Sequence, residues 1–348
     1  MSGFFKTVDT WFDRRAVRIP ERQISTELRW QHLHSFGDFP LAYAATIERY
    51  LSTFGDEFGA IAYAQKMGVT FALGDPLVGA MKARTLISDF VGAFGDPVFV
   101  ACQHRTAEIL AARGYSINGF GHDTAIDLRG HSFAGGAYKR IRYASNLMKS
   151  KGITVTEQPG DSFSGQEIKK MSARWRQTRV ASREVRFLNR AFSVKPGPEV
   201  RRFYAISDKA AVIGFISFDP IYTDQKIVAY LASQKRRVPE DSAYLDLAIM
   251  RHAIDTFKEE GIETVYLGLS PMADIDQSGF DMELQWLRKA LRYAYEADWI
   301  NRRFFNSKGL AANKNRFRGR LVPLYIGLPP EGSNLFRVFA LLRLIQVL

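Results

Sequence analysis

The chain has 348 residues, of which 46% are hydrophobic and 24% charged, a composition that excludes a disordered or fibrous protein and suggests two globular domains. Its 48 lysines and arginines exceed its 36 aspartates and glutamates, so the formal net charge of +12 favours acidic partners: nucleic acid, anionic membrane or phosphorylated ligands. The single cysteine, Cys102, excludes a disulfide framework and a cysteine-based zinc cluster, and its apolar neighbours predict a buried strand residue.

The first predicted unit begins after a basic, aromatic lead segment, residues 1–23. The segment has no secretory signal pattern, and no apolar run is long enough to span a bilayer, so we expect a cytoplasmic protein. Residues 24–156 then show a mixed α/β pattern. Strands are predicted at 58–64, 68–73, 97–102 and 123–128, and helices at 79–94, 104–113 and 136–150.

The second predicted unit, residues 157–330, starts with three antiparallel strands. The predicted order is strands 202–207, 211–219 and 227–233, helix 244–260, strand 264–269 and helix 281–297. This order resembles the GNAT acyltransferase fold, and a helix–glycine–strand joint occurs in both units, at Gly114 and Gly261. We therefore predict an α/β (α+β) fold of two tandem GNAT-like domains, with mixed, mostly antiparallel sheets flanked by helices. Residues 331–348 are predicted to form an apolar C-terminal helix.

The helix predicted at 136–150 has two contrasting faces. The spacing i, i+3, i+7, i+10 places a basic, hydrogen-bonding set on one face. This set is Lys139, Arg142, Asn146 and Lys149. Ile141, Ala144 and Met148 occupy another face, which is expected to pack against the core. The basic face suits a polyanion such as a phosphate backbone or a lipid headgroup, and a solvated helix face is the alternative.

Four local motifs, in order between residues 60 and 326, carry a resemblance to a known family. They are Gly74-Asp75-Pro76, the run from Phe133 to Asn146, Leu267–Ala273, and the run from Gly309 to Phe317. Together they resemble the C-terminal catalytic domain of the lysyl- and alanyl-phosphatidylglycerol synthases, the multiple peptide resistance factors. The chain is similar to a divergent, stand-alone member of that family. One motif departs: where the family has Asp-Leu-Met-Arg, this sequence has Tyr230-Leu231-Ala232-Ser233.

The resemblance implies an aminoacyl-tRNA donor and a lipid headgroup acceptor at the membrane. The departure at Tyr230–Ser233 leaves the amino acid and the acceptor open, and Asp246 and Arg251 on the next helix are candidate replacements. A soluble small-molecule or peptide acceptor, and a non-catalytic tRNA- or membrane-binding protein, remain alternatives. The glycine-rich loop with which coenzyme A enzymes hold the pyrophosphate is missing, so acyl-CoA is disfavoured. No metal or cofactor is expected, and the oligomeric state stays open.

The predicted functional residues fall into three groups. The candidate catalytic residues are Asp75, Gly268, Ser270 and Asp246. The phosphate-binding face is the set Lys139, Arg142, Asn146 and Lys149, with Arg142 able to grip a phosphate bidentately. The candidate tRNA-binding residues are Arg302, Arg303, Lys308, Lys314, Arg316 and Arg318, interleaved with aromatic rings that can stack on unpaired bases. Asn334–Leu348 is the expected peripheral contact with the inner face of the membrane.

Overall fold

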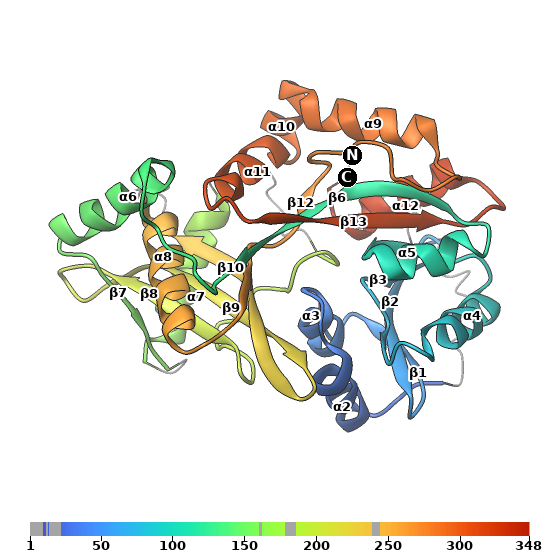
Figure 1. Ribbon diagram of the computed structural model, residues 1–348, viewed down its shortest axis with the longest axis horizontal. Helices are drawn as coiled ribbons and strands as arrows, with labels where there is room; N and C mark the ends of the chain where they lie inside the picture. Colours follow the sequence, from blue (N-terminus) through green and yellow to red (C-terminus); the bar gives the residue numbers. More distant parts are fainter. Residues whose placement is uncertain are drawn as a thin grey trace.

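The computed structural model describes residues 10, 11, 13, 22–159, 162–177, 186–238 and 244–347 of the chain. The predicted lead segment, residues 1–23, lies almost entirely outside this part. Within it, thirteen strands form one sheet, mostly antiparallel, with helices on its faces (Figure 1). The order along the sheet is β1-β2-β3-β5-β13-β6-β11-β10-β9-β8-β7, while β4 pairs with β2 and β12 with β6.

The strands have the following bounds: β1 Ser52–Gly55, β2 Gly59–Lys66, β3 Val69–Leu73, β4 Leu77–Val78, β5 Val98–Cys102, β6 Ser116–Asp127, β7 Thr154–Glu157, β8 Arg201–Ile206, β9 Val212–Thr223, β10 Lys226–Arg237, β11 Thr264–Tyr266, β12 Ser270–Pro271 and β13 Arg320–Leu328. The helices are α2 Thr26–Phe36, α3 Ala42–Ile47, α4 Ala83–Phe94, α5 His104–Ala111, the short 3₁₀ turn Gly136–Tyr138, α6 Lys139–Ser150, α7 Gly165–Gln177, α8 Tyr244–Glu259, α9 Gln285–Glu296, α10 Asp298–Arg303, α11 Ser307–Asn315 and α12 Asn334–Leu344.

Most predicted elements are present, with shifted ends. The helix expected at 79–94 begins at Ala83, and the strand expected at 123–128 begins seven residues earlier, at Ser116. Helix α6 buries Ile141, Ala144 and Met148, as its periodicity predicts, and packs against α8. Cys102 lies fully buried in β5.

Strand β13 connects regions that the sequence assigns to different units. It comes from the predicted second domain, yet it lies between β5 and β6 of the predicted first domain, antiparallel to both. Strand β11 also pairs with β6, so the sheet is continuous across the two halves. The division into domains at 24–156 and 157–330 stays a prediction.

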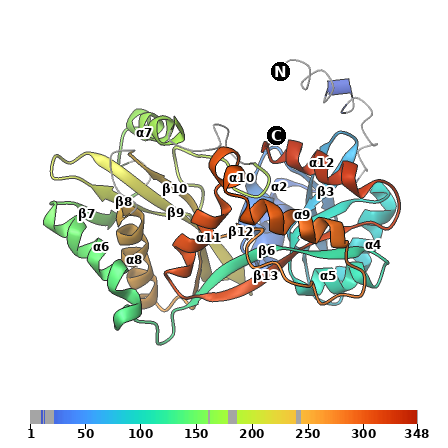
Figure 2. The same ribbon diagram turned by 90° about the horizontal axis from the view of Figure 1, so that it is seen from above.

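The C-terminal helix α12 packs against its own chain. Ala340, Leu341 and Ile345 are buried in the same apolar core as β2 and β3 residues such as Phe71. Figure 2 shows α12 and α9 on one side of the sheet. Two of its apolar side chains remain in solvent, Leu335 at 70% and Phe339 at 37% exposure. Across the residues described here, every helix is too short or too polar to cross a bilayer.

Candidate active site

A small pocket opens near the middle of the sheet, where the two halves meet. Its walls come from the ends of β3 and β5, from β6, β9, β10 and β13, and from the loop that crosses between the halves at residues 188–190. Most of the lining is apolar, and its polar lining residues include Asp75, Gln103, Asp123, Asn189, Arg190, Asp219 and Ser233. The enclosed space is small, about 30 Å³, which is room for one or two water molecules.

Asp75 belongs to the Gly-Asp-Pro turn that follows β3. Gly74 has a φ of +66°, and a Cβ there would lie 2.9 Å from the Phe39 ring, so both the backbone and the space require glycine. The Asp75 carboxylate accepts a hydrogen bond from the Gln103 N–H at 3.0 Å and another from the Thr106 hydroxyl. Burial raises the pKa of Asp75 to about 6. Within the described part of the chain no lysine, arginine or histidine forms an ion pair with it.

Asp123 and Lys314 form a second charged group of the site. Asp123 lies on β6 and is 2% exposed, and its carboxylate accepts from the N–H of Thr124 at 2.7 Å. Burial raises the pKa of Asp123, while Lys314 and backbone hydrogen bonds from Thr124 and Gly268 oppose that rise. Lys314 lies behind the pocket wall at 3% exposure and donates to the carbonyl oxygens of Gly268 and Leu269. Burial lowers the pKa of Lys314 to about 7, and the charge of Asp123 opposes that fall.

The opposite wall carries a buried ion pair. Arg190 Nε donates to Asp219 Oδ2 at 2.9 Å, and the two side chains are only 2% and 1% exposed. The Ser233 hydroxyl donates to Asp219 Oδ1 at 2.8 Å, and Arg190 Nη2 reaches that hydroxyl oxygen at 3.5 Å. Asp219 lies directly opposite Leu231 in the β9–β10 ladder, so the two side chains point to the same face of the sheet.

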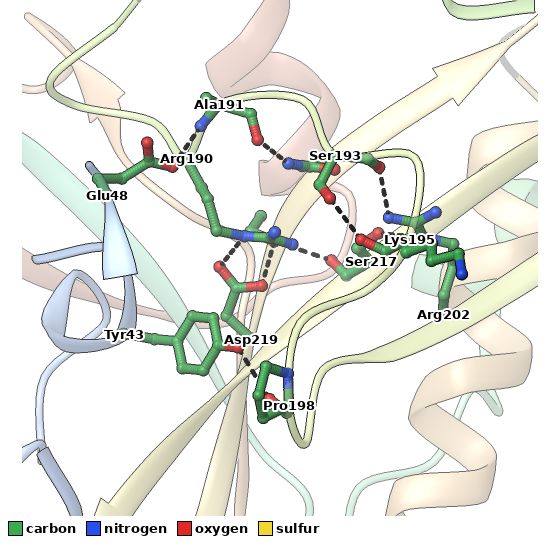
Figure 3. A network of polar contacts seen from close by, with 12 residues as sticks. Tyr43, Glu48, Arg190, Ala191, Ser193, Lys195, Pro198, Arg202, Ser217 and Asp219 are labelled. Atoms are coloured by element: carbon green, nitrogen blue, oxygen red, sulfur yellow. Dashed lines mark hydrogen bonds and ion pairs between the residues drawn. The ribbon is translucent and has the colours of Figure 1, made fainter. Parts of the chain in front are cut away.

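The loop that carries Arg190 is held from both halves of the molecule (Figure 3). From the N-terminal half, Glu48 accepts from the Ala191 N–H at 2.7 Å, and the Tyr43 hydroxyl donates to the Pro198 carbonyl at 2.8 Å. From the other half, Gln234 donates to the Ala191 carbonyl and Asp219 holds Arg190. These contacts fix residues 188–190 as a wall of the pocket.

The structure brings only some of the predicted catalytic residues together. Asp75 and Gly268 both line the pocket, and the role of the Gly268 N–H as an oxyanion donor stays a prediction. Ser270 is fully buried beside β6, and its hydroxyl has no hydrogen-bond partner among the described residues. Asp246 lies on α8 outside the pocket lining, 3.5 Å from Arg237.

The predicted phosphate face on α6 is remote from the pocket. Lys139, Asn146 and Lys149 are exposed, but none of the four residues of this face lines the pocket, and α6 lies at the far end of the sheet (Figure 1). Arg142 donates to the carbonyl oxygens of Phe133 and Gly135, both at 2.6 Å. Its guanidinium therefore fastens the turn that precedes α6.

The predicted tRNA-binding group divides in two. Arg302, Arg303 and Arg318 are exposed, and Arg316 is half-buried. Lys308 is half-buried and donates to Asp298 and to the Glu296 carbonyl. The assignment of Lys314 to this group is wrong, because a side chain that is 3% exposed cannot belong to a surface that tRNA touches.

Sequence reasoning missed three residues of the site: Asp123, Arg190 and Asp219. Asp123 falls inside a strand that was correctly expected, and an aspartate within an apolar strand was a usable signal. Arg190 lies outside every predicted element, and Asp219 is the last residue of a predicted strand. Neither has a partner within reach along the sequence, so their pairing depends on the fold.

The chain thus forms a mostly antiparallel sheet flanked by helices, with carboxylates lining a pocket near its middle. Residues 30–327 match the family described as phosphatidylglycerol lysyltransferase, C-terminal, and the chain belongs to that family. This membership confirms the predicted family.

Solved structures agree with the fold. The chain is similar to L-PGS from Bacillus licheniformis, with a TM-score of 0.74 at 16% identity over 94% of this chain and 99% of that one. It is also similar to the C-terminal domain of a protein described as a lysylphosphatidylglycerol synthetase from Agrobacterium fabrum, with a TM-score of 0.74 at 18% identity over 92% and 96% of the two chains. FemX gives a TM-score of 0.54 at 10% identity over 92% of this chain and all of that one.

One curated sequence relative is longer than this chain. An uncharacterized protein of Corynebacterium glutamicum is 20% identical over 270 residues, which are 74% of this chain and 33% of that protein. The chain thus spans about a third of the length of this relative.

Proposed function

We propose that the protein transfers an aminoacyl group from a charged tRNA to the polar headgroup of a membrane lipid. The pocket carries the proposal, because in a chain of this family it brings two charged groups together. One is Asp75, a carboxylate without an ion pair among the described residues, and the other is Asp123, with Lys314 behind the pocket wall. An aminoacyl ester is already activated, so transfer needs positioning and proton movement more than a strong nucleophile. The pocket offers both.

Each charged group has a role in this reaction. The Asp75 carboxylate binds the α-ammonium of the aminoacyl group, for which it has unused acceptor capacity. Asp123 takes the proton of the acceptor hydroxyl as its oxygen attacks the ester carbonyl carbon. The carbon–oxygen bond to the tRNA 3′ end then breaks, and the proton passes to that leaving oxygen. Lys314 acts as a positioning residue, because it fixes the Gly268–Leu269 backbone and sets the proton affinity of Asp123.

Two exposed surfaces suit the two large substrates. The α6 face, with Lys139, Asn146 and Lys149, and the exposed Arg302, Arg303 and Arg318 can contact tRNA phosphates away from the pocket. Leu335 and Phe339 on α12 are the proposed peripheral membrane contact. The whole segment Asn334–Leu348 cannot serve, because the other face of α12 packs on the sheet. Trp286 and Tyr293 are exposed on α9 and carry rings suited to the lipid headgroup layer.

Charged tRNA pools and a membrane extract test the proposal directly. The purified protein is incubated with both, and each labelled amino acid is followed into the lipid phase. Label in lipid supports the proposal. Label in a water-soluble adduct favours the same donor with a small-molecule or peptide acceptor, and tRNA binding without any transfer favours a non-catalytic binding protein.

A further inference from the structure

Two arginines and two tyrosines from three helices meet beside α6. Arg140 and Tyr143 lie on α6, Tyr244 is the first residue of α8, and Arg316 directly follows α11. The Arg140 guanidinium lies over the Tyr244 ring, 5.4 Å from its centroid. The Tyr143 ring meets the Tyr244 ring edge-on, with 5.4 Å between the two centroids. Arg316 lies close enough to Arg140 and Tyr244 for both to act on its ionisation. These four residues are the arginine–tyrosine patch.

Neither arginine of the patch forms an ion pair with a carboxylate of the described residues. Arg316 donates a hydrogen bond to the Asn313 side chain at 3.0 Å, which is a neutral partner. Burial lowers the pKa of Arg316, and the charge of Arg140 lowers it further, whereas a neighbouring carboxylate would raise it. Two cations held near each other without an acid favour an anion between them.

The charged neighbours of the patch leave this positive excess in place. Asp246, in the first turn of α8, lies 3.5 Å from Arg237 and also acts on Lys235. Lys139 precedes Arg140 on α6, is exposed, and adds one more positive charge. The described surroundings thus supply further cations, and their acid is already engaged by other cations.

Tyr143 adds an aromatic surface to this cationic site. Its side chain is 53% exposed, and the contact with Tyr244 holds the ring in place. Proteins bind unpaired bases by stacking them on aromatic rings, while nearby arginines take the phosphates. A lipid headgroup supplies a phosphate but no flat ring, so the combination of groups in the patch favours RNA.

The patch lies next to the support of the pocket wall. Arg316 is two residues beyond Lys314, which donates to the carbonyl oxygens of Gly268 and Leu269. Both overall views place α11 between α6 and the middle of the sheet (Figures 1 and 2). A single strand bound at the patch therefore has a route from the basic face of α6 toward the pocket.

We propose that the arginine–tyrosine patch binds one nucleotide of unpaired RNA, in the 3′ end of the donor tRNA. The base stacks on the Tyr143 ring, and the phosphate lies between Arg140 and Arg316. This inference rests on the proposed function, because the donor there is a charged tRNA, and it adds the place where the single-stranded end is held. Stacking tolerates any base, so the same contact serves tRNAs of different sequence.

The test measures binding of uncharged tRNA to the full chain, with the unpaired 3′ end either intact or removed. Tyr143→Ala should weaken binding of intact tRNA about tenfold, and Tyr143→Phe, which keeps the ring, should change it less than about twofold. Both variants should equal the wild type on truncated tRNA. Arg140→Gln should reduce the salt slope by about 1 for intact tRNA only. Phe58→Ala, at a 52% exposed ring between β1 and β2, is the matched control and should have no effect.

A fluorescent base reports the stacking itself. 2-Aminopurine placed in the unpaired 3′ end should be quenched by the wild type and by Tyr143→Phe, and much less by Tyr143→Ala at saturation. Equal quenching by all three proteins overturns the inference, as does an equal loss of affinity for intact and truncated tRNA. Weaker binding of Tyr143→Ala to anionic vesicles, with unchanged tRNA affinity, also overturns it and makes the patch a lipid site.

These binding measurements require no transfer, so the two proposals fail separately. The expected tRNA results without any label in lipid would overturn the proposed function alone. Label in lipid, with Tyr143→Ala binding intact tRNA like the wild type, would overturn the inference alone. Absence of tRNA binding by the wild type would overturn both.

Discussion

Asp219 and Leu231 face each other across the β9–β10 ladder, and this register brings a carboxylate to the wall beside Tyr230–Ser233. There the family motif has Asp-Leu-Met-Arg and this chain has neither charge. Arg190, from the crossing loop, reaches Ser233 at the end of the same stretch. A carboxylate and a guanidinium are thus present at this wall, but they come from a neighbouring strand and a loop, and they neutralise each other. The expected replacements, Asp246 and Arg251, lie on α8 outside the pocket lining.

Asp75→Asn should reduce transfer about 100-fold or more while leaving the fold intact. The amide keeps the shape but loses the charge that binds the α-ammonium, and a group of this kind contributes about 10²–10⁴-fold. Steady-state transfer kinetics and circular dichroism measure the two effects. Asp208→Asn, at an exposed turn, is the matched control and should be neutral. Full activity of Asp75→Asn would remove Asp75 from the site.

The pH dependence of activity and of stability should run in opposite directions around pH 6. Burial raises the pKa of Asp75 from 3.8 to about 6, so the folded protein binds a proton there that the unfolded chain releases. The contribution of Asp75 to the free energy of unfolding therefore falls as pH rises from about 4 to 6, by about 3 kcal/mol at most. Activity needs the carboxylate and should fall about tenfold per pH unit below about 6. Denaturation and kinetics of the wild type and Asp75→Asn check this, because the variant should lose the Asp75 part of the stability slope.

Lys314→Met should lower stability and activity together, whereas Lys314→Met with Asp123→Asn should recover stability alone. Removing one member of a buried charged pair costs about 3–5 kcal/mol, because the other charge is left uncompensated. The double variant removes both charges but also the proposed base. Urea denaturation with transfer kinetics distinguishes the two roles. Recovery of activity in the double variant would show that Asp123 does not move the proton.

Reversing the charge of Lys139 and Lys149 on α6 should weaken tRNA binding without changing stability. Removing the interaction with one phosphate should reduce the salt dependence, the slope of log K against log [salt], by about 1. Arg142→Ala should instead destabilise the protein by about 1.5–3 kcal/mol, since its guanidinium holds the Phe133 and Gly135 carbonyls. Filter binding at several salt concentrations measures the first effect and thermal denaturation the second. Unaltered tRNA affinity in the charge-reversal variant would make α6 a solvated face.

Leu335→Asp with Phe339→Asp should abolish binding to anionic vesicles in a folded protein. Both side chains are exposed, so the change removes apolar contact without disturbing the core. Deleting residues 334–348 is a poorer test, because Ala340 and Leu341 belong to the core and their loss should destabilise the domain. Met81→Asp, at a 95% exposed apolar residue elsewhere, is the control. Vesicle sedimentation gives the result, and retained binding would exclude this membrane contact.

Features that depend on neighbours along the chain could be predicted from the sequence. Periodicity placed α6 and its buried face of Ile141, Ala144 and Met148, because burial of a helix repeats every three to four residues. The turn around Asp75 could also be predicted, since its glycine and proline determine the local backbone conformation. Short-range geometry is enough for both.

Which charges meet in the pocket depends on the three-dimensional fold. In the sequence, Lys314 is part of a basic tract and nothing there predicts that it is buried. Its burial follows from the packing of α11 behind Gly268. The partners Arg190 and Asp219 are 29 residues apart, and their contact depends on the strand register and on a loop held by Tyr43 and Glu48. Desolvation and ion pairing act through space, so the sequence does not determine them until the chain has folded.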